Sequence, residues 1–119
     1  MRKTFAKWTC LIGIACAALI WNPGLASANP PKQCPGPNMA CLLSTTNGNV
    51  WMHTAANSTS TKIAVIPKGA TVAIACYSSG ESVYGDPIWY WLKYGSSWGF
   101  TTGYYLNTGH DPNPGVPAC

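Results

Sequence analysis

Apolar and polar residues alternate at a period of two along much of the chain, which is the spacing of β-strands. The clearest case is the segment 88–94, Ile-Trp-Tyr-Trp-Leu-Lys-Tyr. One face of this predicted strand holds Ile88, Tyr90, Leu92 and Tyr94, and the other holds Trp89, Trp91 and Lys93. Because both faces are apolar, either the strand is covered on both sides or the tryptophans face a ligand. The pattern leaves both alternatives open.

Similar short patterns predict the remaining elements. Further strands are expected over residues 50–53, 62–66, 71–77 and 98–102, and the alternation in 71–77 places Val72, Ile74 and Cys76 on one face. Turn residues separate them, such as Asn47-Gly48 and Pro67-Lys68-Gly69. We expect a loop over 78–87 and a single helical turn or short strand over 103–106. No segment has helical periodicity, so the sequence predicts an all-β fold, a small barrel of about five to six short strands.

The ends of the chain differ in composition from this central part. Residues 1–28 combine a basic start, an apolar run and the motif Ala-Ser-Ala, which predicts a secretory signal peptide cleaved after Ala28. A lipoprotein signal with Cys16 as the lipidated residue is the alternative. Residues 29–46 form a Pro-rich amino-terminal arm, and the barrel with its carboxy-terminal tail occupies 47–119. We expect one exported domain.

Four cysteines remain after the signal peptide, and an even number in a short exported chain predicts two disulfides. Three pairings are possible. We favour Cys34–Cys41, which closes a small Pro/Gly loop, and Cys76–Cys119, which ties the tail to a strand. A zinc site is the rival interpretation, but the spacings lack paired C-x-x-C motifs.

Charge excludes some functions. Lysines and acids nearly balance outside the signal peptide, so no basic surface predicts nucleic-acid binding, and no membrane contact is expected after cleavage. Candidate catalytic groups are His53, the pair His110-Asp111, and the carboxylates Glu81 and Asp86. We interpret them as a solvent-facing strand residue, a solvated turn and loop capping, respectively. No nucleophile elbow, metal spacing or cofactor motif accompanies them, so we expect neither catalysis nor a cofactor.

The order of motifs resembles a bacterial SH3-like domain over residues 50–106. The segment 50–57 stands at the position of that family's "VNVRSGPS"-like opening, and 67–69 at its "P-x-G" turn. The segments 89–92 and 99–106 are similar to its "W-Y-K-V" strand and its closing "G-Y-V-S-x-x-Y-L". The insert 80–87 and the cysteines resemble a subgroup of small secreted actinobacterial proteins. The opening motif departs from the family pattern, and Thr101 stands where a core Val is expected.

The resemblance implies a ligand groove. Its residues would be Trp89, Tyr105, Thr102, Trp91, His53 and Asn57. Exposed, rigid aromatics at such a groove suit sugar faces and peptide backbones. On this hypothesis Trp89→Ala removes binding and leaves the fold intact. The alternative is that the arm or the tail covers the two tryptophans.

These observations predict a secreted, non-catalytic binding module, expected to be a monomer. The resemblance implies peptidoglycan as the ligand, since bacterial SH3-like domains are generally cell-wall targeting units. The alternative is a protein-binding effector or inhibitor that acts on another secreted or surface protein.

Overall fold

The computed structural model describes residues 29–34 and 41–119, and the predicted signal peptide lies outside these residues. The described part is built from six strands and one short 3-10 helix. These are β3 (Leu42–Thr45), β4 (Val50–His53), β5 (Lys62–Ile66), β6 (Thr71–Val83), β7 (Asp86–Tyr94), β8 (Ser97–Thr102) and η3 (Gly103–Tyr105). The predicted all-β fold is confirmed.

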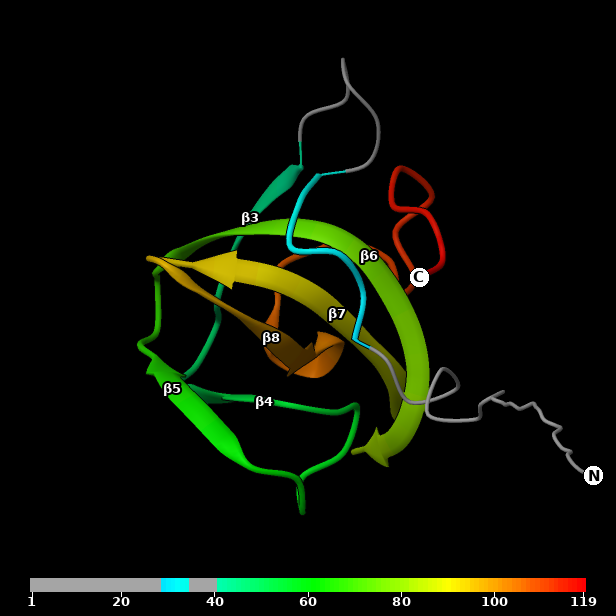
Figure 1. The fold of residues 1–119 in the computed structure, drawn as a ribbon. Coiled ribbons are helices and arrows are strands. Elements are labelled where there is room, and N and C mark those ends of the chain that lie inside the picture. Colours follow the sequence, from blue (N-terminus) through cyan, green and yellow to red (C-terminus); the bar gives the residue numbers. More distant parts are fainter. Residues whose placement is uncertain (1–28, 35–40) are drawn as a thin grey trace, which may run out of the picture.

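The six strands form one antiparallel sheet in the order β3-β6-β7-β8-β4-β5. Figure 1 shows the sheet curling into a partly open barrel, with the long β6–β7 pair arched over β8 and η3. The two edge strands, β3 and β5, approach each other near the β5–β6 turn. There the Thr46 N–H donates to the Ala70 carbonyl, and the Gly69 N–H donates to the Thr46 carbonyl. Strands far apart in sequence thereby enclose one interior.

Two clusters of buried side chains lie on opposite faces of this sheet. The inner cluster fills the barrel and contains Val50, Met52, Ile66, Val72, Ile74, Ile88, Tyr90, Leu92, Leu106 and Val116. The outer cluster contains Ala75, Cys76, Trp89, Trp91 and Phe100. The alternation predicted for residues 88–94 is therefore correct, and β7 is buried on both faces.

Two local predictions were wrong. The segment predicted as a loop over 78–87 is mostly a hairpin, because β6 continues to Val83 and β7 begins at Asp86. In addition, the register between β6 and β7 shifts between Ile74 and Cys76, so that Ala75 is an extra residue. Such a bulge rotates the strand, and Cys76 therefore joins the outer cluster instead of sharing the inner face with Ile74.

Both predicted disulfides are present and hold the ends of the chain against the sheet. Cys76–Cys119 fixes the tail beside β6, where Ala118 forms a parallel bridge with Tyr77. Cys34–Cys41 joins the arm to the start of β3, a strand within the stretch predicted as arm. Among the described residues, no helix has the length and apolarity needed to cross a bilayer.

Candidate functional site

The two tryptophans proposed for the ligand groove are buried. Trp89 and Trp91 each expose only 1% of their surface, so the expectation of an exposed Trp89 is wrong. Both indole N–H groups donate to backbone carbonyls, Trp89 to Glu81 at 2.8 Å and Trp91 to Pro31 at 3.0 Å. A buried indole with its N–H satisfied and its faces packed is a core residue.

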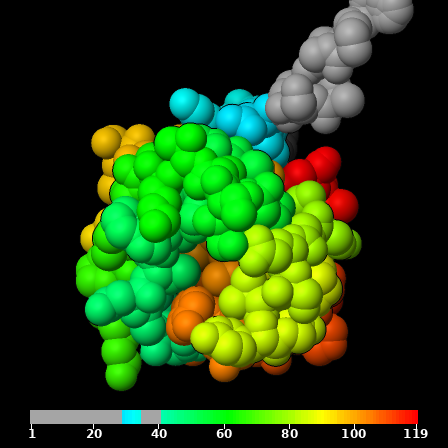
Figure 2. Space-filling view, turned by 90° about the horizontal axis from the view of Figure 1, so that it is seen from below, coloured from blue at the N-terminus to red at the C-terminus, as the bar shows by residue number. Residues whose placement is uncertain are grey.

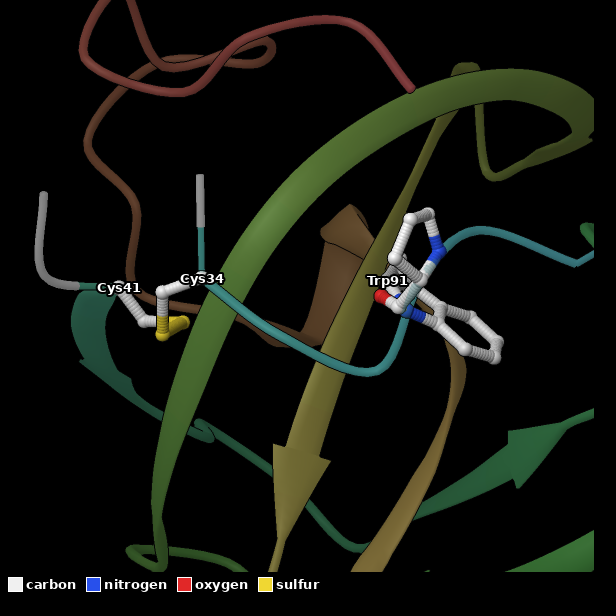
Figure 3. The surroundings of a disulfide bond; sticks show 4 residues. Cys34, Cys41 and Trp91 are labelled. Atoms are coloured by element: carbon white, nitrogen blue, oxygen red, sulfur yellow. A yellow bond between two sulfur atoms is a disulfide. The ribbon is translucent and has the colours of Figure 1, made fainter. Parts of the chain in front are cut away.

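The amino-terminal arm supplies the cover over Trp91. Figure 3 shows the arm crossing β6 and β7 between the Cys34–Cys41 disulfide and the Trp91 indole. Trp91 also packs on the rings of Phe100, with centroids 5.0 Å apart, and Trp98, at 6.1 Å. The alternative in which the arm covers a tryptophan is therefore the one observed at Trp91, whereas Trp89 is covered by contacts with Glu81 and His53. Its physical reason is that a small domain buries apolar surface with whatever segment is available.

The loop that follows β4 covers the neighbouring part of the outer face. The Glu81 N–H donates to the Ala56 carbonyl at 3.0 Å, and the N–H and hydroxyl of Ser58 both donate to the Glu81 carboxylate at 2.8 Å. These bonds from Ser58 lower the pKa of Glu81. Gly80 is required at this contact because a Cβ would lie 2.1 Å from the Ala56 carbonyl oxygen.

Three further predicted groove residues hold local structure. His53 is buried, not solvent-facing as expected, and its ring meets that of Trp89 edge to face at 5.8 Å. The Thr102 hydroxyl accepts the Tyr104 N–H at 3.2 Å and caps η3. The Asn57 side chain accepts the Ser60 N–H at 2.7 Å and closes the first loop.

Tyr105 is the predicted groove residue that joins an exposed aromatic surface. The centroid of its ring lies 5.0 Å from the centroid of the Tyr104 ring. The Tyr104 centroid in turn lies 4.9 Å from that of the Tyr84 ring. Tyr84 is 78% exposed and Tyr104 is 44% exposed. We call these three residues the tyrosine cluster. In Figure 2 the yellow-green hairpin tip lies against the orange segment that contains η3, and the surface is hollowed between them and the green first loop.

The structure places Tyr84 at the tip of the β6–β7 hairpin. Val83 pairs with Asp86, so Tyr84 and Gly85 form a two-residue turn with φ values of 50° and 90°. Such turns favour Asn-Gly because both residues take positive φ. A tyrosine in this conformation costs roughly 1–2 kcal/mol relative to an ordinary backbone. The sequence signal for this turn is Gly85, which directly follows Tyr84 between two strand-forming segments.

A carboxyl pair lies behind the tyrosine cluster, and it is not the pair Glu81 and Asp86 considered from sequence. Asp86 instead hydrogen-bonds Asp111 of the tail. Burial and this bond raise the pKa of Asp86 to about 6. Burial alone would raise the pKa of Asp111, but hydrogen bonds from Asp86, Thr108 and Tyr90 outweigh it and lower that pKa.

A cavity of about 650 Å³ lies between the arm, the first loop and the Cys76–Cys119 disulfide. Phe100 and Ala75 form part of its wall, next to Ala56. It belongs to the same outer face that the arm and the tail cover. Within residues 29–34 and 41–119, no group of three or more His, Cys, Asp or Glu side chains is arranged to hold a metal ion.

No known family, curated protein or solved structure matches this chain. The site is therefore interpreted from its own geometry.

Proposed function

We propose that the chain is a secreted, non-catalytic binding module of the bacterial SH3-like class that recognises cell-wall peptidoglycan through the tyrosine cluster. The observation that carries this proposal is the continuous ring contact from Tyr84 through Tyr104 to Tyr105, in which Tyr84 and Tyr104 are exposed and Tyr105 is half-buried. Tyrosines offer a large, rigid contact area that loses little entropy on binding. The two disulfides are consistent with an extracellular location.

The backbone at Tyr84 supports a role beyond packing. An unfavourable positive φ at an aromatic residue that is 78% exposed adds little to the core. Strained conformations persist where function requires them more often than elsewhere. Here the strained turn holds the Tyr84 ring next to Tyr104, which extends the aromatic surface beyond η3.

Tyr84→Asn tests the proposal because it separates binding from folding. Asn is preferred at this turn position, so the variant should be at least as stable as the wild type. We expect wild-type protein to co-sediment with purified sacculi at both low and moderate salt, and Tyr84→Asn to lose at least about tenfold in affinity, or 1.4 kcal/mol. Trp51→Thr is the matched control, since it removes an exposed aromatic from β4. Equal retention of wild type and Tyr84→Asn would refute the assignment.

A protein-directed role is the second candidate, and a separate surface favours it. Trp51 and Val65 face each other across β4 and β5, and are 44% and 46% exposed. The Lys62 ammonium lies 4.9 Å from the Trp51 ring centroid. Since β5 is an edge of the sheet, a partner strand can add there. Absence of sacculus binding together with a stoichiometric complex that Trp51→Thr disrupts would establish this role instead.

A further inference from the structure

Three segments meet at the Asp86–Asp111 pair. Asp86 begins β7, and Asp111 belongs to the tail. The Tyr90 hydroxyl of β7 donates to the Asp111 carboxylate at 2.7 Å and accepts the Asn113 N–H at 2.9 Å. The Thr108 hydroxyl donates to the same carboxylate oxygen. The carboxyl pair thus lies at the centre of a network that holds the tail to the sheet.

The same pair supports both halves of the tyrosine cluster. Asp86 closes the hairpin turn that carries Tyr84, because it pairs with Val83 and its carboxylate accepts the Ile88 N–H at 3.0 Å. Asp111 packs against Gly103, the first residue of η3, where a Cβ would lie 2.7 Å from its Oδ2 atom. Each aspartate thus adjoins a segment that carries part of the cluster, the hairpin turn for Asp86 and η3 for Asp111.

Ionisation of both carboxyl groups brings two negative charges close together. One shared proton permits a hydrogen bond between the two carboxyl groups, whereas two adjacent carboxylates repel each other. Asp86 titrates at about 6 in the folded protein. The other titratable groups that face Asp111 are the Tyr90 hydroxyl, whose pKa burial raises, and His110.

We propose that the Asp86–Asp111 pair is a pH-controlled clamp: with one shared proton it holds the hairpin, η3 and the tail together, and with both carboxyls ionised it loosens the tyrosine cluster. The sign follows from the two pKa shifts. The raised pKa of Asp86 favours the folded arrangement at low pH, and this contribution is lost as pH rises from about 4 to about 6. The lowered pKa of Asp111 acts oppositely and is lost only in stronger acid. The clamp is therefore tightest in mildly acidic solution.

The test needs no ligand, so its outcome is independent of the proposed function. NMR would follow the side-chain carboxyl carbons of Asp86 and Asp111 and the exchange protection of the Asn113 and Tyr104 amides from pH 4.5 to 8. We expect one carboxyl midpoint near 6, and a fall of roughly fivefold or more in amide protection across it, the change that about 1 kcal/mol of loosening produces.

Three variants assign the transition. Asp86→Asn mimics the protonated carboxyl and should keep the protection constant over the whole range. Glu81→Gln, which removes the other hairpin acid, and His110→Gln should leave the transition unchanged. A midpoint for Asp86 near 4, unchanged protection, or a transition that survives in Asp86→Asn would overturn the proposal.

The consequence for binding rests on the proposed function and is measured separately. Sacculus binding should be stronger at pH 5.5 than at pH 7.5 in the wild type and equal at the two values in Asp86→Asn. A normal titration without any sacculus binding would reject the proposed ligand and retain the clamp. Binding with equal affinity at both pH values in the wild type would reject the clamp as a control of the site.

Discussion

Replacing Thr101 by Val should stabilise the fold. Thr101 is fully buried in β8, and its hydroxyl oxygen has no hydrogen-bond partner among the described residues. A buried hydroxyl without a partner costs about 1–3 kcal/mol. Valine keeps the β-branched shape that suits the strand and places a methyl group where the hydroxyl lies. We expect Thr101→Val to gain about 1–3 kcal/mol.

Denaturant unfolding with the disulfides intact, followed by tryptophan fluorescence, would measure this gain. The midpoint should rise while the slope of the free energy of unfolding stays unchanged, because the surface exposed on unfolding is the same. Thermal unfolding should shift upward by about 4–8 °C for each kcal/mol in a domain of this size.

The adjacent residue supplies the control. Thr102 is also buried, but its hydroxyl accepts the Tyr104 N–H and caps η3. The same chemical change, Thr102→Val, should therefore destabilise by about 1 kcal/mol. If Thr101→Val were neutral or destabilising, the Thr101 hydroxyl would have a partner in solution and the reasoning would be refuted.

Three further outcomes follow from the covered outer face. Trp89→Ala should lower the free energy of unfolding by about 3–5 kcal/mol, because it empties a fully buried site; an unaltered midpoint would contradict this. Replacing Cys76 and Cys119 together by Ser should cost about 4 kcal/mol in the loop-entropy account, since the bridge spans 43 residues, and no loss would show that the unfolded chain is not constrained by it. Removing residues 29–33 should shift the Trp91 emission to longer wavelength, since the arm carbonyl that accepts its indole N–H is lost; an unshifted spectrum would show that other segments suffice to bury Trp91.

The proposed groove illustrates where sequence reasoning stops. Trp89 and Trp91 were correctly placed on the face opposite Tyr90, because side-chain direction on a strand follows from the alternation alone. What lies over that face depends on segments distant in sequence. Pro31, which accepts the Trp91 indole N–H, is 60 residues away. No local pattern specifies such a contact.

The tyrosine cluster and the carboxyl pair were missed for the same reason. Tyr84 and Tyr104 become neighbours only when the hairpin reaches η3, and Asp86 meets Asp111 only when the tail folds back beside β7. The bulge at Ala75 accounts for a separate error, the face assigned to Cys76, since an extra residue reverses which face the following side chains occupy.

The sequence by itself determined the all-β class, most strand positions and the inner faces apart from that of β6 beyond Ile74, because these follow from the two-residue alternation and from turn residues such as those of 67–69. It also indicated two disulfides from the even number of cysteines, and the favoured one of the three possible pairings is the one observed. Only the tertiary structure decided which aromatics are covered and which acids interact with each other. Burial and pKa depend on the summed surroundings of a group, and here those surroundings come from the arm, the first loop and the tail.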